Sequence, residues 1–232
     1  MASSFSSEAI RVERPSKTLR ELTLDKVRDA ITHGYFRPGD RLVERDLCAQ
    51  LGVSRTVVRE VLRHLESEGI VSNPGNRGPM VAELDADEAQ QIYQIRAALE
   101  GMAARQCAEA GDAALAERLS GALAAIVAAY EAQDMPAVLS ATTGFYELLF
   151  TGVGLTVAWE IEKQLTVRIN HLRSLTIRTK GRAVDGPTRM AAILEAIRQG
   201  DGPRAQEAAA AHVDSARRIA IAMLEQDAAS QS

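Results

Sequence analysis

The sequence predicts a mainly α-helical protein in two parts, the first of which carries a small β-hairpin. Apolar residues recur at helical spacing through most of the chain, whereas β-prone runs occur only at residues 70–72 and 80–82. Aromatic residues make up only 4% of the chain, so its core must consist of Leu, Ile, Val and Ala, which favours packed helices over a β-sandwich. The length of 232 residues is sufficient for two modest domains.

The pattern divides the chain into four segments. Residues 1–16 are polar and are expected to form a flexible arm, and residues 17–82 combine three short helices with the hairpin. Residues 83–86 form a linker, and residues 87–228 form an all-α helical bundle. Within this bundle the pattern predicts a loop that begins at Lys180 and closes at Gly186 and Pro187.

Composition indicates a cytoplasmic protein without membrane contact. The N-terminal residues lack the apolar stretch of a signal peptide, and the most apolar segment, residues 122–130, is too short to span a bilayer. The two cysteines, Cys48 and Cys107, lie in different predicted helices and have no metal-ligand spacing, which suggests a reducing compartment.

The charge is unevenly distributed along the chain. A net charge of −4 alone argues against a nucleic-acid binder. However, residues 1–82 contain 13 Lys and Arg against 11 Asp and Glu, whereas residues 83–232 contain 14 against 20. A weakly basic head on an acidic body suits a modular DNA-binding protein, because the charge of the contacting face matters more than the total.

Residues 44–68 have the organisation of a helix-turn-helix. A short helix and a glycine-containing turn precede a helix that starts at Ser54, a favourable N-cap. One face of this helix is apolar, and Arg55, Thr56 and Arg59 occupy the first turns of the other face. Arginine can hold guanine or phosphate with two hydrogen bonds, and the Ser54 hydroxyl can meet a phosphate oxygen. The alternative is an amphipathic helix with solvated arginines, but the flanking turn, helix and hairpin favour DNA recognition.

Two runs in this head closely resemble the GntR family of bacterial transcriptional regulators. They are PGDRLVERDL at residues 38–47 and LGVSRTVVREVLRHLE at residues 51–66. The resemblance implies a winged helix-turn-helix that binds operator double-stranded DNA, with the hairpin tip near the minor groove. The operator contacts that it implies are Arg45, Arg55, Thr56, Arg59, Asn76 and Arg77.

The helical part is similar to the FadR-like branch of this family, whose all-helical FCD-type domain binds a small-molecule effector. The similarity lies in RAALE at residues 96–100, FYELL at residues 145–149 and ILEAIRQGD at residues 193–201. It implies a homodimeric, ligand-responsive regulator, and we expect a repressor rather than an enzyme. The Ala- and Leu-rich helices of residues 97–129 offer a surface for the dimer, although they could equally form core.

Many members of this branch hold a divalent metal through an Asp and a His one helical turn apart and through two further His. The corresponding positions here are Thr142, Tyr146, Met190 and His212. Only His212 is a strong metal ligand, because neutral hydroxyls bind weakly and a thioether does not suit hard or borderline metals. The sequence therefore predicts no metal and no cofactor, and instead a cavity that binds an organic ligand through hydrogen bonds.

Arginines in the helical part are candidates for binding a carboxylate. Arg168 falls in an apolar helical stripe, so its charge is expected to point inward and to need an anion from the protein or from a ligand. Arg96 poses the same question, but Glu100 four residues later can pair with it, which favours a structural role. His212 is as consistent with a core histidine as with a ligand contact. Arg173 and Arg182 could equally face solvent.

Two other functions stay open at this point. The first is a metal-dependent regulator of the same fold, which the missing metal ligands disfavour. The second is an enzyme with a DNA-targeting head, for which the sequence offers no nucleophile–base pair and no glycine-rich phosphate loop.

Overall fold

The computed structural model describes residues 17–32, 35–177 and 179–231, and it divides the chain into two compact units, Met1–Ala82 and Glu83–Ser232. The predicted fold class is confirmed, because the described residues form nine α-helices and one small antiparallel sheet. The flexible arm expected at residues 1–16 lies outside the described residues.

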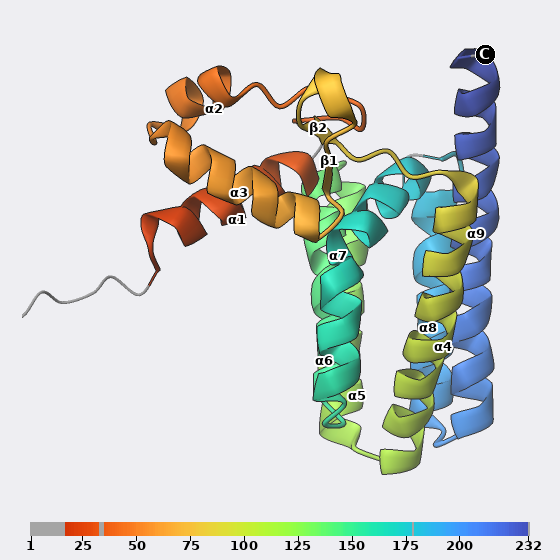
Figure 1. Ribbon diagram of the computed structural model, residues 1–232. Helices are drawn as coiled ribbons and strands as arrows, with labels where there is room; N and C mark the ends of the chain where they lie inside the picture. The colour runs from red at the N-terminus through yellow and green to blue at the C-terminus, as the bar shows by residue number, and fades with distance from the viewer. Residues whose placement is uncertain (1–16, 33–34, 178, 232) are drawn as a thin grey trace, which may run out of the picture. The chain divides into compact units, whose positions relative to one another are not determined.

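The first unit consists of three α-helices and a two-stranded sheet (Figure 1). The helices are α1 (Leu19–Thr32), α2 (Glu44–Leu51) and α3 (Arg55–Ser67), and the strands are β1 (Val71–Ser72) and β2 (Met80–Val81). In the antiparallel register, Val71 pairs with Val81 and Ser72 with Met80. A 3-10 turn, η2 (Gly75–Arg77), lies between the two strands, so the hairpin is the predicted wing.

Local sequence explains where α2 ends and α3 begins. Gly52 follows α2 with a φ of 66°, a left-handed conformation that glycine adopts without steric strain. Ser54 precedes α3, and its hydroxyl accepts a hydrogen bond from the Val57 backbone N–H at 3.4 Å. These two caps define the first turn of α3 and therefore the side chains that it presents.

The second unit is a bundle of six helices. They are α4 (Ala86–Ala110), α5 (Ala113–Glu131), α6 (Met135–Thr151), α7 (Thr156–Ile177), α8 (Arg182–Arg198) and α9 (Gly202–Gln231). Helices α4 and α9 lie side by side, α5 packs on α6, and α8 packs on α9 (Figure 1). The carboxylates of Asp85, Asp112 and Asp134 accept backbone N–H hydrogen bonds at the starts of α4, α5 and α6.

The start of α8 differs from the sequence prediction. The turn signal at Gly186 and Pro187 predicted the end of a loop, whereas α8 begins at Arg182 and contains Pro187 in its second turn. Proline has no backbone N–H to donate to the carbonyl four residues earlier, so α8 lacks one helical hydrogen bond in its second turn and continues through it. As a result Arg182 lies on a helix that borders the interior of the bundle.

Helix α5 corrects the interpretation of the most apolar segment. Ala113–Glu131 is the one helix in the described part of the chain whose length and composition would allow it to cross a membrane. The apolar helix is longer than the predicted segment 122–130, because apolar residues continue upstream through Leu115 and Leu119. These two residues and Ile126 belong to the core cluster of the bundle. Packing in the bundle core therefore accounts for the apolar character of α5.

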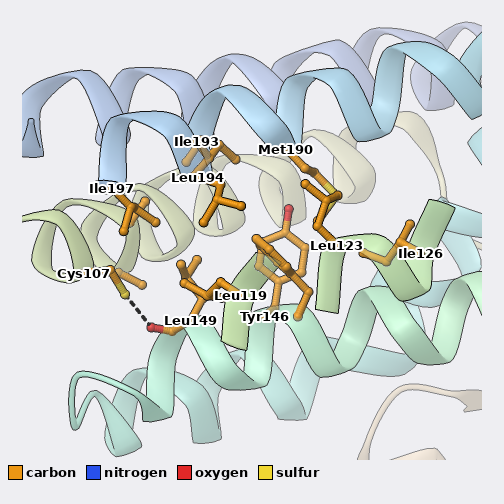
Figure 2. Packing of buried hydrophobic residues seen from close by; sticks show 14 of the residues in the cluster. Cys107, Leu119, Leu123, Ile126, Tyr146, Leu149, Met190, Ile193, Leu194 and Ile197 are labelled. Carbon is orange, nitrogen blue, oxygen red and sulfur yellow. Dashed lines mark hydrogen bonds between the residues drawn. The ribbon is translucent and has the colours of Figure 1, made fainter. Parts of the chain in front are cut away.

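The centre of the bundle is a continuous apolar core. Figure 2 shows Tyr146 of α6 among Leu119 and Leu123 of α5 and Met190 of α8. The same view shows Cys107, whose Sγ donates a hydrogen bond to the Leu149 carbonyl at 3.1 Å. Burial raises the pKa of the Cys107 thiol to about 12, so this cysteine stays protonated and unreactive.

Gly152→Ala is expected to destabilise the protein, although its φ of −60° is ordinary for a helix. A Cβ at this position would clash with Leu115 Cδ1 and would lie 2.7 Å from the Leu148 carbonyl oxygen. Because overpacking typically costs about 1–3 kcal/mol, we expect the free energy of unfolding in urea to fall by that amount. Gly121→Ala is the control, since its Cβ would meet no atom within 4 Å, and it should raise this free energy by roughly 0.5–1 kcal/mol. Equal effects would contradict the packing argument.

Candidate DNA interface and buried cavity

Helix α3 buries one face and exposes the other. Val58, Val61, Leu62 and Leu65 are buried and attach the helix to the first unit. The opposite side is polar and accessible. The exposed residues on it include Arg55, Thr56, Arg59 and Arg63. The first two turns of α3 therefore present two arginines and a hydroxyl to solvent, as a helix that enters the major groove requires.

Arg59 is oriented by a carboxylate from α2. Its Nε lies 2.8 and 2.9 Å from the two carboxylate oxygens of Glu44. The hydrogen bond to Glu44, together with its charge, raises the pKa of Arg59. An exposed pair of this kind adds little to stability, but it sets the direction of the side chain and leaves both terminal nitrogens free for a phosphate or a base. Arg55 has no carboxylate partner among the residues described.

The remaining predicted operator contacts lie on α2, at the α3 cap and in the wing. The Arg45 side chain is 79% exposed, and its Nε lies 3.0 Å from Asp46 Oδ1. The Ser54 hydroxyl caps α3, and Arg77 is exposed in η2. Asn76 lies in the same turn, but its side chain is outside the described part of the structure. All seven predicted residues belong to the first unit, and their contacts with DNA remain predictions.

The second unit contains a small cavity near the start of α8. Its volume is about 30 Å³, which is enough for about two waters at roughly 10–15 Å³ each. Four of the six predicted ligand-binding residues line it, namely Arg96, Thr142, Met190 and His212. Arg173 and Arg182 also line it, and the sequence had left both as residues that could face solvent.

Two predicted ligand-binding residues do not line this cavity. Tyr146 is buried but is not among the lining residues, and its hydroxyl has no hydrogen-bond partner. The Arg168 side chain is 28% exposed, and its Nη1 lies 3.3 Å from the Glu88 carboxylate. The apolar stripe from which an inward Arg168 was predicted also includes Ile161, whose exposed fraction is 44%, so this face of α7 is partly accessible. Arg168 therefore pairs with α4 through Glu88, and its guanidinium is not part of the cavity.

Two of the three cavity arginines have carboxylate partners. Arg96 is buried, and its Nε lies 2.8 Å from Glu100 Oε1. Burial opposes the charge of Arg96, but the attraction of Glu100 and further neighbours outweighs it and raises the pKa of Arg96. Arg182 is also buried, and its Nη1 lies 3.5 Å from Asp185 Oδ2. Both charges are thus compensated by the protein.

The third, Arg173, has only neutral hydrogen-bond partners. Its Nη1 donates to Asn170 Oδ1 at 3.0 Å and to Thr143 Oγ1 at 3.4 Å. The guanidinium also lies over the Tyr146 ring, 5.0 Å from its centroid. No carboxylate lies within 4.0 Å of Arg173 in the described structure, although the residue is only 7% exposed. Burial, followed by repulsion from Arg96, lowers the pKa of Arg173.

A pair of buried carboxyl groups lies next to Arg96. Glu100 on α4 and Glu162 on α7 are both buried, and Glu162 Oε1 lies 4.0 Å from Arg96 Nε. Burial, followed by repulsion from Glu100, raises the pKa of Glu162 to about 7, against the attraction of Arg96 and Arg173. The pair thus holds a proton over much of the acidic pH range.

His212 is neutral in this surrounding. Burial, followed by repulsion from Arg182, Arg96 and Arg173, lowers the pKa of His212 well below its usual value. Its Nδ1 is buried without a hydrogen-bond partner. A neutral imidazole on the cavity wall can exchange a hydrogen bond with a polar ligand group.

The donor set does not fit a divalent metal. The Thr142 hydroxyl donates to the Val138 carbonyl at 2.7 Å, and burial raises the pKa of Tyr146, so its phenol keeps its proton. Met190 offers a thioether, and the cavity already holds three guanidinium groups that repel a dication. Across residues 17–32, 35–177 and 179–231, no group of three or more His, Cys, Asp and Glu is arranged to hold a metal.

Comparison with known proteins gives two matches along the chain. The FCD domain matches residues 91–215, and the bacterial regulatory proteins of the gntR family match residues 19–81. The chain belongs to the GntR family. This confirms the predicted resemblance, so the protein is a DNA-binding transcriptional regulator with a helix-turn-helix head and a helical FCD domain. The matched families and named relatives are transcriptional regulators, not enzymes.

Individual relatives align with different fractions of this chain. An HTH-type transcriptional regulator from the TAR-I ttuE-ttuC' intergenic region of Agrobacterium vitis is 35% identical over 126 residues, 53% of this chain and 74% of that protein. The galactonate operon transcriptional repressor of Escherichia coli is 28% identical over 213 residues, 81% of this chain and 90% of that protein. A GntR regulator structure from Rhodococcus sp. RHA1 has a TM-score of 0.77 and 25% identity, covering 88% of this chain and 97% of that one.

The sequence contained a signal for Arg173 that the apolar stripe obscured. Polar residues recur along α7 at Glu162, Thr166, Asn170 and Arg173, a helical spacing that places them along one side of the helix. Three of them, Glu162, Asn170 and Arg173, are buried. A polar stripe of this kind normally faces solvent, and only the surrounding helices show that it faces the interior.

Glu162→Gln is expected to reduce the pH dependence of stability. The pKa of Glu162 rises from 4.5 to about 7 on folding, so between these pH values the folded state binds more protons than the unfolded state. The free energy of unfolding therefore falls as pH rises through this window, by up to about 3 kcal/mol. Urea titrations at about pH 5 and about pH 8 measure this effect. The free energy of unfolding of the variant, relative to that of wild type, should be higher at the upper pH than at the lower.

The matched control is Glu160→Gln on the same helix, where an exposed carboxylate pairs with Lys163 at 2.7 Å. This variant should follow the wild-type pH profile. A Glu162→Gln profile that also parallels wild type would show that Glu162 ionises normally.

Proposed function

We propose that this regulator is a cytoplasmic, homodimeric repressor. Its affinity for operator DNA changes when an organic carboxylate binds in the FCD domain. The observation that carries the proposal is the combination of outward arginines at the start of α3 with a cavity in the second unit whose Arg173 has no carboxylate partner. The first feature suits DNA recognition, and the second suits an anionic ligand.

The DNA-binding role of particular residues is supported by their position and chemistry. Arg55 and Arg59 are exposed at the end of α3 that a recognition helix directs toward base edges. The Glu44 carboxylate holds Arg59 through Nε and leaves the outer edge of its guanidinium for DNA. Arg45 and Arg77 are exposed on α2 and the wing, where they can neutralise phosphates and fix the register of the head.

The effector role is supported by charge. Arg96 and Arg182 are paired within the protein, whereas Arg173 is not, so an anionic ligand would supply the partner that Arg173 lacks. His212 and Thr142 add neutral hydrogen-bonding groups on the same wall. The name of the E. coli relative refers to galactonate, the anion of a sugar acid, which agrees with an organic acid as the effector here.

Linkage would connect the two sites. In a homodimer the two heads must meet major grooves about one helical turn, roughly 34 Å, apart. A ligand that binds one arrangement of the heads more tightly than the other shifts the protein toward that arrangement. The resulting change in operator affinity is limited by how much more tightly the ligand binds the preferred arrangement. Sedimentation of the purified protein at the concentrations used for DNA binding tests the dimer, and a monomer bound to operator would contradict it.

Arg55→Ala and Arg59→Ala should each weaken operator binding by roughly 1–3 kcal/mol, about 5- to 150-fold, because each removes a guanidinium that can contact a base or phosphate. The measurement is fluorescence anisotropy at fixed salt, with a duplex that the wild-type protein selects from a random pool. Arg105→Ala removes the same charge from an exposed ion pair on α4 and should bind like wild type. Wild-type affinity and selectivity in the folded Arg55→Ala, Arg59→Ala double variant would refute the DNA-binding assignment.

A further inference from the structure

We propose that the Arg173 guanidinium replaces a metal ion in this cavity: it is the cation that receives the carboxylate of the effector, and binding needs no metal. The inference rests on the proposed effector, and it deepens that proposal by naming the residue and the chemistry. In many members of this branch the corresponding cavity holds a divalent metal, whereas the donor set of this chain does not fit one.

The position of Arg173 supports the replacement. Four positions of this chain correspond to the metal ligands of such relatives, and three of them, Thr142, Met190 and His212, line the cavity together with Arg173. The fourth is Tyr146, and the Arg173 guanidinium lies over its ring at 5.0 Å. The cation therefore lies among the side chains that would otherwise surround a metal.

The hydrogen bonds of Arg173 leave room for a ligand. Both of its described hydrogen bonds use Nη1, with Asn170 and Thr143 as neutral acceptors. Its Nε and Nη2 make no described hydrogen bond, and neither is among the fully buried atoms without a partner. A planar guanidinium with free donors can hold a carboxylate through two parallel hydrogen bonds.

The charges of the cavity also select an anion over a cation. Arg96 and Arg182 also line the cavity, and although each has a carboxylate partner, both repel a second cation. His212 is neutral and adds no negative charge. A buried guanidinium without a carboxylate is unfavourable, so an incoming carboxylate gains both the ion pair and the relief of that burial.

The test uses full-length protein that has been treated with EDTA and dialysed. Acetate and malonate are the probes, acetamide and malonamide are their uncharged controls, and binding is measured by thermal shift and calorimetry at constant ionic strength. We expect the acids to raise the Tm of the metal-free protein and the amides to leave it unchanged. Zinc or manganese chloride should not strengthen acid binding, and neither metal alone should bind in the cavity.

Three substitutions at two positions of α7 separate the proposed role from a structural one. Arg173→Met keeps the length of the side chain but removes its charge, and it should weaken acid binding at least about tenfold. Without acid, this variant should melt close to wild type, because losing the attraction between Arg173 and Glu162 opposes the gain from removing a buried charge that has no described carboxylate within 4.0 Å. Arg168→Met is the matched control, since Arg168 pairs with Glu88 outside the cavity, and it should keep the wild-type acid response. Arg173→Lys keeps the charge without the planar fork and should bind acid with intermediate affinity.

Several results would overturn the proposal. One is an acid response that disappears after EDTA and returns with zinc or manganese. Another is a lower Tm of acid-free Arg173→Met and Arg173→Lys together with unchanged acid affinity, which would make Arg173 structural. A third is the absence of any response of wild type to either acid. Operator binding through Arg55 and Arg59 is measured separately, so these outcomes leave the DNA-binding assignment intact and can be told apart from its failure.

Discussion

The requirement that a buried charge finds a partner shapes the interior of the helical domain. Arg96 on α4 is almost fully buried, and its ion pair with Glu100 at 2.8 Å makes that burial tolerable. Removing one partner from such a pair typically costs about 3–5 kcal/mol, because the other charge is left without compensation. Glu162 and Arg173 bring α7 into the same network, so the packing of α4 and α7 depends on how these charges are shared.

The same requirement has the opposite consequence on α3. There the arginines lie in water, where an exposed charge costs little, and the helix is held by its apolar face through residues such as Val58 and Leu65. The helix can therefore keep several charges that the protein does not neutralise. Glu44 restricts the direction of Arg59 without burying it. The arginine side chains of α3 can therefore contact DNA, because the apolar face and not these charges packs the helix against the first unit.

Local patterns predicted the head and the helix order, because caps, glycine turns and apolar spacing act within a few residues. Ser54, Gly52 and the wing turn belong to this class. The cavity was harder to predict, since it depends on which helices surround α7. Arg168 and Arg173 are both arginines on that helix, and only packing distinguishes the one that meets Glu88 from the one that faces the cavity. The start of α8 was predicted wrongly because Gly186 and Pro187 normally indicate a turn, whereas α8 contains both residues.

The environments of the two cysteines have a practical consequence. The Cys107 thiol is enclosed in the bundle and hydrogen-bonded to the Leu149 carbonyl, whereas Cys48 is partly accessible on α2. A maleimide dye should therefore couple to the unmodified chain at Cys48, on the helix that directly precedes α3. The wild-type protein carries its own attachment point for a fluorophore in the head, so operator occupancy can be followed without engineering a cysteine.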